Sequence, residues 1–196
     1  GAMYRAVTLY ALDNGIIDSA GNIDKAALTA ALDDIAIDFK IMPDGSQHTT
    51  LNAKDVEKEI RSLRVSNNVS PIAAIAEVRH ALVAKQQAMG TSKGIVMDGR
   101  DIGTTVFPAA ELKIFVNASA ETRAQRRFLE MTEKGNAVSY EDVLANVVSR
   151  DHIDETREES PLRRADDAIA LDNSQMNVEE QDSWLLARFN ETIAKL

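Results

Sequence analysis

An arginine and two aspartates lie within one glycine-containing segment, Asp98-Gly99-Arg100-Asp101-Ile102-Gly103-Thr104. The apolar residues just before it, at 95–97, predict a short buried strand. In open α/β sheets, ligands bind beyond the carboxyl ends of the strands. There an arginine offers a fork of donors to a phosphate and an aspartate offers an acceptor. The same residues are equally compatible with a polar turn that is closed by a structural salt bridge.

A second candidate group lies further along the chain. Arg150, Asp154 and Arg157 are spaced i, i+4 and i+7, which puts all three on one face of a helix. Two arginines that flank an aspartate could bind a phosphate while the carboxylate accepts hydrogen bonds from ribose hydroxyls. By spacing alone, a solvated ladder of surface salt bridges is the more common explanation of such a pattern.

Two further groups have simpler explanations. Arg123, Arg126 and Arg127 share a helical face and could clamp a triphosphate if this segment folds over it as a lid, although an exposed basic face explains the same spacing. Ser70 and Arg79 lie on one predicted helix, where a helix cap and a surface arginine account for them. Nothing in their spacing alone makes them ligands.

The composition restricts the classes of function. The 196 residues are 44% hydrophobic, contain no cysteine and carry a formal net charge of −9. We expect a globular cytoplasmic protein that repels long polyanions such as DNA but binds a small phosphorylated ligand where arginines cluster. No apolar run has the length of a membrane span, and three scattered histidines, at 48, 80 and 152, argue against a histidine-rich zinc site.

The first half of the chain predicts helices and one hairpin. Helices are expected over 1–12 and 24–34, and strands over 35–41 and 47–51 with a turn between them. Asn52 is a candidate N-cap for a helix that runs to about residue 63. Residues 35–69 together would form a small mixed insertion.

The second half alternates helices with strands, which favours a parallel sheet. Ser70 is a candidate N-cap with Pro71 at the first helical position, and this helix is expected to end at Gly90. The later strands are expected at 95–97, 112–116 and 168–171. The later helices are expected from Ser119 to near Gly135, from Ser139 to about Arg157, and over 178–195.

One common phosphate-binding motif does not occur in these residues. A loop of the form Gly-x4-Gly-Lys-Ser/Thr is absent. The nearest pieces, at 90–94 and 99–105, do not fit its spacing, and the first is better explained as a turn from a helix into a strand.

Taken in order, these separate segments resemble the bacterial cytidylate kinases, a branch of the nucleoside monophosphate kinases. The resemblance extends nearly from end to end of the chain, and the insertion at 35–69 corresponds to the extra module of the cytidylate branch. The similar segments are Gly1-Ala2-Met3-Tyr4-Arg5, then 70–79 with its serine and arginine nine residues apart, then 98–104, 150–157, Pro161-Leu162 and 165–168.

The resemblance implies an α/β fold with a P-loop kinase-type parallel sheet and flanking helices. Residues 1–34 and 70–196 would form the kinase core, 35–69 a small mixed insertion of the NMP-binding type, and the region around 123–160 a helical lid. The family places its first strand and phosphate loop before the segment that resembles residues 1–5, and neither is present in this sequence. We therefore expect a chain that starts late and depends on a missing N-terminal segment or a partner strand.

The resemblance also implies an activity, the transfer of the γ-phosphoryl group of ATP to CMP or dCMP, which gives CDP or dCDP and ADP. Carried over position by position, Arg5, Arg100 and Arg157 would hold the acceptor phosphate. Arg100 and Arg157 would also act in catalysis, because phosphoryl transfer depends on alignment and charge stabilisation rather than on a covalent nucleophile.

The same resemblance implies which residues bind the base and the ribose of the acceptor and which contact ATP. Ser70, Arg79 and Asp101 would bind the cytosine base, since a carboxylate can accept a hydrogen bond from its exocyclic amine. Asp154, with Arg150, would hold the ribose. Arg123 and Arg127 on the lid would contact ATP. Mg²⁺ would bridge the ATP phosphates, held mostly by substrate oxygens and water.

Three hypotheses follow. The chain is most of a cytidylate kinase, or it is a truncated relative that binds CMP without transferring phosphate, or it is a structural or assembly protein in which the arginines are dispensable. Because the loop lysine is not in the sequence, we expect the 196-residue polypeptide alone to be nearly inactive.

Overall fold

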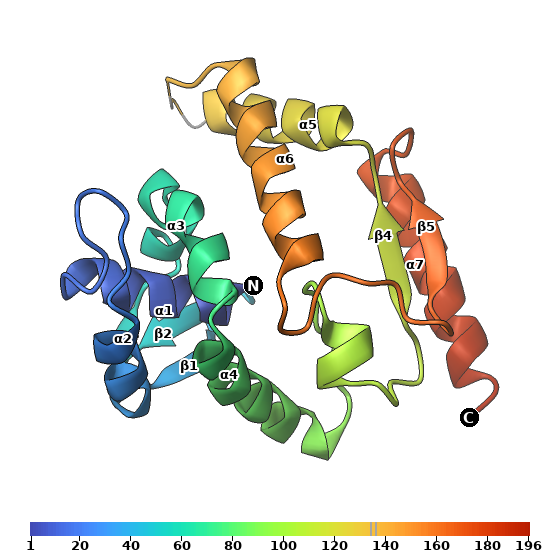
Figure 1. Ribbon diagram of the computed structural model, residues 1–196. Helices are drawn as coiled ribbons and strands as arrows, with labels where there is room; N and C mark the ends of the chain where they lie inside the picture. Colours follow the sequence, from blue (N-terminus) through green and yellow to red (C-terminus); the bar gives the residue numbers. More distant parts are fainter. Residues whose placement is uncertain (134, 136) are drawn as a thin grey trace. The chain divides into compact units, whose positions relative to one another are not determined.

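The computed structural model of the chain describes residues 1–133, 135 and 137–196. The chain divides into two compact units. Unit 1 comprises residues 1–99 and 157–159, and unit 2 comprises residues 100–156 and 160–196. Each unit has its own helices and its own small sheet, so the fold class is mixed α/β (Figure 1).

Unit 1 begins with two helices, as predicted. Helix α1 (Ala2–Asp13) buries Met3, Tyr4 and Val7. The next helix is α2 (Lys25–Ala31), and Asp24 caps it because its carboxylate accepts a hydrogen bond from the amide of Ala27. A 3₁₀ turn at Leu32–Asp34 completes this helical segment. The helices predicted over 1–12 and 24–34 are therefore confirmed.

The strands of unit 1 form an antiparallel sheet in the order β1 (Ile37–Ile41), β2 (Gln47–Leu51), β3 (Lys54–Asp55). Phe39 of β1 lies opposite Thr49 of β2, which confirms the predicted hairpin. The turn between these strands uses Gly45 at φ +83°, a backbone angle that favours glycine.

The helix predicted to start at Asn52 is wrong. Asn52 has φ 48°, and its side-chain oxygen accepts a hydrogen bond from the amide of Ala36, so it forms part of the turn between β2 and β3. Asparagine tolerates this left-handed conformation better than most residues, which explains why a good N-cap residue serves a turn here. In place of the helix, the chain forms β3 and a 3₁₀ turn at Glu59–Arg61.

The single helix predicted over 70–89 is two helices in the structure. Helix α3 (Leu63–Ala73) begins after Ser62, whose side chain accepts a hydrogen bond from the amide of Val65. Ser70 and Pro71 therefore lie inside α3 rather than at a helix start. Both serines are suitable caps by residue type, and the burial of the apolar residues of α3 against α1 favours the earlier start.

Helix α4 (Ala76–Met89) starts after Ile75, which is extended, and ends at Gly90 as predicted. Residues 95–97, predicted as a strand, have no regular secondary structure, and Val96 is 97% exposed. Among the described residues no strand pairs with this segment. A lone strand is unstable because its backbone groups lack hydrogen-bond partners, so the apolar pattern alone did not produce one.

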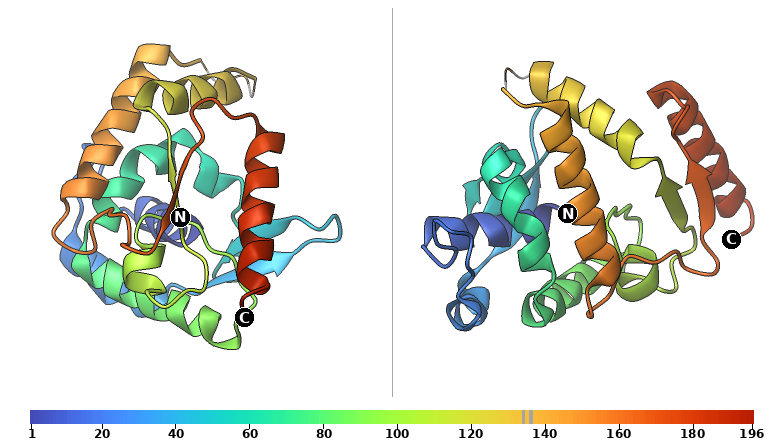
Figure 2. Two further views of the ribbon diagram at one scale, coloured as in Figure 1. Left: turned by 90° about the vertical axis from the view of Figure 1, so that its right-hand side faces the viewer. Right: turned by 45° about the horizontal axis from the view of Figure 1, so that its top comes forward.

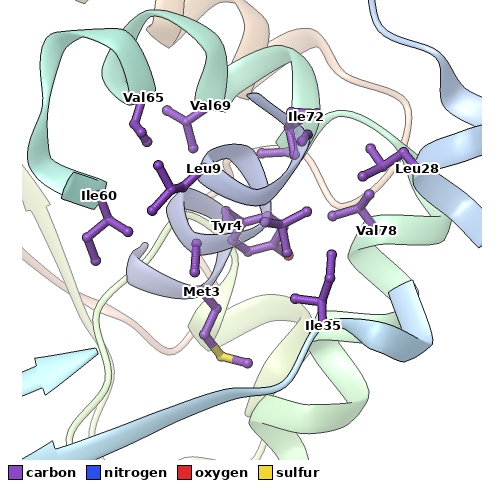
Figure 3. Packing of buried hydrophobic residues seen from close by; sticks show 14 of the residues in the cluster. Met3, Tyr4, Leu9, Leu28, Ile35, Ile60, Val65, Val69, Ile72 and Val78 are labelled. Carbon is purple, nitrogen blue, oxygen red and sulfur yellow. The ribbon is translucent and has the colours of Figure 1, made fainter. Parts of the chain in front are cut away.

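The core of unit 1 joins all four helices α1 to α4 with β2 and the loops between them. Figure 3 shows Met3, Tyr4 and Leu9 of α1 lying among apolar side chains of α3 and of the segments around Ile35 and Ile60. Burial of a large apolar side chain stabilises a fold by about 1.5–3 kcal/mol. This core therefore gives unit 1 a substantial stability of its own.

Unit 2 contains one parallel pair of strands, with Phe115 opposite Ala170. Helix α7 lies along one side of this pair (Figure 2). The parallel pair and the later helices confirm the corresponding predictions, although among the described residues the sheet has only these two strands. The elements are a π-helical turn (Ile102–Val106), β4 (Ile114–Asn117), α5 (Ala120–Glu133), α6 (Tyr140–Thr156), β5 (Ile169–Asp172) and α7 (Val178–Ile193).

Two serines precede the helices of the α5–α6 hairpin, as predicted. Ser119 Oγ accepts a hydrogen bond from the amide of Thr122 at 3.1 Å, and Ser139 Oγ accepts one from the amide of Asp142 at 3.0 Å. The predicted end of the first helix near Gly135 borders residues 134 and 136, which lie outside the described residues. The buried cluster between the two helices consists of Ala124, Val143 and Val147.

None of the helices that the structure describes is both long enough and apolar enough to cross a membrane.

Candidate functional site

The residues predicted to bind nucleotides are divided between the two units. Those in unit 1 are Arg5, Ser70, Arg79 and Arg157. Those in unit 2 are Arg100, Asp101, Arg123, Arg127, Arg150 and Asp154.

Arg5 connects three parts of unit 1. It projects from α1, and its Nη1 donates hydrogen bonds to the carbonyl oxygen of Ile60 at 3.0 Å and to Ser66 Oγ at 2.9 Å. These bonds tie α1 to the 3₁₀ turn and to α3. The guanidinium group is thereby held in a fixed position within unit 1.

Arg79 is a buried arginine, only 1% exposed, and not the surface residue that its spacing suggested. Its guanidinium carbon lies 5.2 Å from the centre of the Tyr4 ring, and its Nη1 donates to the carbonyl oxygen of Ala73 at 3.0 Å. Ser70 is also buried, inside α3, so neither of the simple explanations from the sequence applies. Burial of a charged group is costly, and a residue kept there serves packing or binding.

Arg157 follows the end of α6 in the chain but is grouped with unit 1. Its side chain is buried. Arg157 was predicted to share one helical face with Arg150 and Asp154, but the structure ends α6 at Thr156. The i, i+4 part of the predicted pattern is confirmed as helical, because Arg150 and Asp154 both lie on α6.

Arg100 and Asp154 are brought together in unit 2. The Nε of Arg100 donates to Oδ2 of Asp154 at 2.9 Å, although 54 residues separate them in sequence. Asp154 is buried, whereas about half of the Arg100 side chain, 48%, remains exposed. The carboxylate therefore orients a guanidinium group that still has surface to offer a ligand.

Three arginines of unit 2, Arg100, Arg127 and Arg150, form what we call the arginine cluster. Burial lowers the pKa of Arg150, and the nearby positive charges of Arg127 and Arg100 lower it further, while Asp154 and Asp151 act in the opposite direction. Burial likewise lowers the pKa of Arg127. Like charges held together in a partly desolvated place repel one another, and an anionic ligand relieves that repulsion.

The other arginines of α5 have defined partners within unit 2. Arg123 makes a bidentate ion pair with Asp151, at 2.9 Å and 2.6 Å, and its Nε donates to the carbonyl oxygen of Ala118. Arg126 donates to the carbonyl oxygens of Asn173 and Met176, just after β5. Arg126 therefore ties α5 to the backbone just after β5.

The backbone around Asp101 forms a tight turn that holds Arg100 and Asp101. The carbonyl oxygen of Asp101 accepts hydrogen bonds from the amides of Thr104, Thr105 and Val106, and the side chain of Asp101 is itself buried. A π-helical turn of this kind is uncommon and often occurs at functional sites.

Two residues that support the arginines were not predicted from the sequence. Asp151 pairs with Arg123, and Asn146 Oδ1 accepts a hydrogen bond from Arg127 at 3.0 Å. Asn146 lies one helical turn before Arg150, which is a signal that could have suggested it. The partner of Asp151 lies 28 residues away in sequence, and spacing along one helix carries no information about such a pair.

The described residues include no group of three or more histidine, cysteine, aspartate or glutamate side chains that could hold a metal ion. A divalent cation that accompanies a triphosphate takes most of its ligands from phosphate oxygens and water, so the side chains present are compatible with that mode of binding.

Comparison with known proteins shows the family of the chain. The family model described as "Cytidylate kinase" matches residues 1–190. The chain is 57% identical over 194 residues to a protein of Bacteroides fragilis named cytidylate kinase, and the match covers 98% of the chain and 84% of that protein. Proteins with the same name from Phocaeicola vulgatus and Flavobacterium johnsoniae are 59% and 57% identical, with the same coverage.

These matches extend along almost the whole chain. The chain therefore belongs to the cytidylate kinase family.

Proposed function

We propose that the chain transfers the γ-phosphoryl group of ATP to CMP or dCMP, giving CDP or dCDP and ADP. Membership of the cytidylate kinase family supports the reaction. The single observation of geometry that carries the proposal is the ion pair, 2.9 Å long, between the half-exposed Arg100 and the buried carboxylate of Asp154. Such a site joins positive charge for phosphates with an acceptor for sugar hydroxyls.

The acceptor phosphate is assigned to Arg5, Arg100 and Arg157. Two of these side chains are already oriented by their own units, Arg5 by Ile60 and Ser66 and Arg100 by Asp154. An oriented guanidinium loses less conformational freedom when it binds a phosphate, which raises its contribution to affinity. Arg100 and Arg157 would also stabilise charge on the phosphoryl group as it is transferred.

The cytosine base is assigned to Ser70, Arg79 and Asp101. All three are buried, which supports recognition away from competing water. The carboxylate of Asp101 would accept a hydrogen bond from the exocyclic amine of cytosine. Uracil has a carbonyl oxygen at that position, and its lone pairs would face the carboxylate, so this contact disfavours UMP.

The ribose is assigned to Asp154 with Arg150, and the triphosphate of ATP to Arg123 and Arg127 on the lid. Asp154 can accept hydrogen bonds from ribose hydroxyls through the carboxylate lone pairs that Arg100 does not use. Mg²⁺ bound with ATP would neutralise part of the phosphate charge. The cytoplasm is the expected location, because the reaction uses nucleotide pools.

The parts of the chain would have separate tasks. Residues 1–34 and 70–196 would form the kinase core, 35–69 the NMP-binding-type insertion, and the region around 123–160 the lid. The antiparallel sheet β1–β3 supports a distinct role for 35–69, and the separate buried cluster of the α5–α6 hairpin supports a lid that moves as one piece.

A second candidate function is CMP binding without phosphoryl transfer. The observation that favours it is that the 196 residues contain no Gly-x4-Gly-Lys-Ser/Thr loop, whose lysine and backbone amides hold the ATP phosphates in many kinases. On this candidate, the 196-residue polypeptide alone would bind CMP but release almost no ADP.

The test combines calorimetry of CMP binding with an assay of ADP release from ATP and CMP. We expect the wild-type chain to bind CMP, and Arg100→Ala to weaken that binding by about 1.5–3 kcal/mol, the range for hydrogen bonds to charged groups. The matched control is Arg64→Ala, because Arg64 is an exposed arginine paired only with Asp13 in the described structure. ADP release then separates the two candidates.

Two results would contradict the proposal. One is a wild-type chain that shows neither CMP binding nor a CMP-induced rise in melting temperature. The other is an equal loss of CMP affinity in Arg100→Ala and in the Arg64→Ala control.

A further inference from the structure

We propose that Lys113 is a positioning residue that holds Arg100 and Asp101 in place for the nucleotide, an inference that rests on the proposed function. Lys113 precedes β4, and its side chain is only 7% exposed although it carries a charge. Its Nζ donates to both carboxylate oxygens of Asp167, at 2.9 Å and 2.8 Å, and also to the carbonyl oxygen of Pro108. All of these residues belong to unit 2.

The same side chain contacts the π-helical turn and the segment that follows it directly. Its aliphatic part lies against Gly103, where a Cβ would be 3.3 Å from Cδ of Lys113, and its ammonium group holds the carbonyl oxygen of Pro108. Gly103 lies within the turn and Pro108 lies just after it. Lys113 therefore fixes both the body and the exit of the turn.

The position of the turn determines the positions of Arg100 and Asp101, the residues proposed to bind the nucleotide. The carbonyl oxygen of Asp101 accepts hydrogen bonds from three amides of the turn, and the amide of Phe107 donates to the carbonyl oxygen of Ile102 at 2.7 Å. These short-range bonds make residues 101–107 one rigid piece. A shift at Gly103 or Pro108 therefore moves Asp101 and its neighbour Arg100.

The other side of Lys113 is anchored to the sheet. The carbonyl oxygen of Lys113 accepts a hydrogen bond from the amide of Ile169, the first residue of β5, and Asp167 lies two residues before it. The hydrogen bond from Lys113 lowers the pKa of Asp167 below its ordinary value. Lys113 thus joins the turn to the β4–β5 pair.

A role in positioning explains why a charge is present at all. A nearly buried ammonium group pays a desolvation cost that a methionine of similar length would avoid, so the ion pair is poor evidence of added stability. An ammonium group offers three directed donors, and here they reach a carboxylate and a backbone carbonyl on different segments. The directed contacts fix a position that an apolar side chain could not specify.

The test is Lys113→Met, which keeps the aliphatic part of the side chain and removes the ammonium group. We expect CMP to bind roughly tenfold more weakly, because small misplacements of binding groups have effects of that order or greater. The matched control is Lys195→Met. Lys195 lines the same cavity of about 320 Å³ as Lys113 and Asp167, near the C-terminus, and its loss should leave CMP affinity unchanged.

A double-mutant cycle with Arg100→Ala distinguishes positioning from a general structural role. If Lys113 acts through Arg100, Lys113→Met should reduce CMP affinity much less in the Arg100→Ala background than in wild type. A merely structural lysine would lower the melting temperature and leave CMP affinity the same. That result, or additive losses in the cycle, would overturn the inference.

Two further measurements keep the outcome unambiguous. If Lys113→Met does not fold, Asp167→Asn loosens the same anchor from the exposed side and should still weaken CMP binding about threefold or more. Unchanged affinity in that variant would also overturn the inference. Loss of affinity in Arg100→Ala without loss in either anchor variant rejects the role of Lys113 alone, whereas absence of CMP binding in wild type rejects the proposed function.

Discussion

The apolar side chains in the core of unit 1 are far more deeply buried than those around the β4–β5 pair of unit 2. In unit 1, Leu28, Ile60 and Ile72 are fully buried within one cluster that draws on every helix from α1 to α4. In unit 2, none of the sixteen residues of α7, all of which the structure describes, is buried. The buried cluster in the described part of the α5–α6 hairpin is small.

Unit 1 therefore has a large buried core of its own, whereas unit 2 leaves apolar side chains exposed on several of its elements. Apolar side chains on β4, β5 and α7 are exposed, including Val116, Ile169, Leu186 and Phe189. Exposed apolar residues that gather on neighbouring elements mark surfaces that gain stability from an additional contact. The arginine cluster and Asp101 lie in this less buried unit. Ligand-binding segments are commonly found among the less stable parts of a fold.

The largest expected effect concerns local stability. Amide hydrogens of α1 and α3 should exchange only with global unfolding of unit 1, at a free energy of about 5–15 kcal/mol, whereas those of α7 should exchange by local opening at a small fraction of that value. The measurement is native-state hydrogen exchange followed by mass spectrometry of peptides from each helix. Equal protection of α1 and α7 would contradict the difference between the units.

A pair of truncations sharpens the same comparison. Ile72→Ala removes a fully buried side chain from α3 and should lower the free energy of unfolding by about 2–5 kcal/mol, since it leaves a cavity. Leu186→Ala is the matched change on α7, where the leucine is exposed, and should change it by less than about 0.5 kcal/mol. Urea unfolding of each variant measures both values, and a larger loss from Leu186→Ala would show that α7 is buried in solution.

The elements of unit 1 and unit 2 were predictable from the sequence where local chemistry determines them. Serine caps at 119 and 139 and the hairpin turn at Gly45 are short-range signals, and they gave the correct starts. The choice between Ser62 and Ser70 as a cap depends on which residues pack against α1, and that contact is not local. The strand predicted at 95–97 failed for a related reason, since a strand exists only with a partner.

The candidate site was predictable in its residue types but not in its pairings. Helical spacing put Arg150 and Asp154 on α6, as observed. The contact of Arg100 with Asp154 and that of Arg123 with Asp151 join segments far apart in sequence, and only the fold creates them. The resemblance to a family supplied the grouping that spacing could not supply.

Arg157 provides a further way to compare the units, because it is grouped with unit 1 while Arg100 belongs to unit 2. If both hold the acceptor phosphate, Arg157→Ala should lower CMP affinity by about 1.5–3 kcal/mol, the same loss expected for Arg100→Ala, and should leave the affinity for cytidine nearly unchanged. Calorimetry with both ligands measures this selectivity, and Arg64→Ala again serves as the control. Equal losses for CMP and cytidine would remove Arg157 from the phosphate site.

The smallest expected effect lies within unit 1, in the sheet of the 35–69 segment. His48 Nδ1 lies 2.6 Å from Oδ2 of Asp55, which raises the pKa of His48 above its ordinary value of 6.5, with Glu57 and Asp44 adding to the effect. Lys40 lies opposite His48 in the strand register. The amide of Glu57 and the histidine lower the pKa of Asp55.

The sign of the pH dependence follows from these directions. A raised histidine pKa means that the folded state binds the proton more tightly, so its stabilising contribution is complete below the unfolded pKa and is lost as pH rises through the folded pKa. The contribution of Asp55 is present above its unfolded pKa and is lost as pH falls through its lowered folded pKa. The pair should therefore stabilise the β2–β3 connection most in mildly acidic solution, between these limits.

The measurement is the melting temperature of wild type and of His48→Gln across this pH range, together with an NMR titration of the histidine ring. The difference between the two proteins should be small, because the pair is solvated, and it should shrink as pH rises above the folded histidine pKa. A difference that is constant with pH would mean that His48 acts by packing alone. Because β2 contributes Leu51 to the buried cluster of unit 1, a small pH effect here would also indicate that this packing, rather than the ion pair, holds the sheet in place.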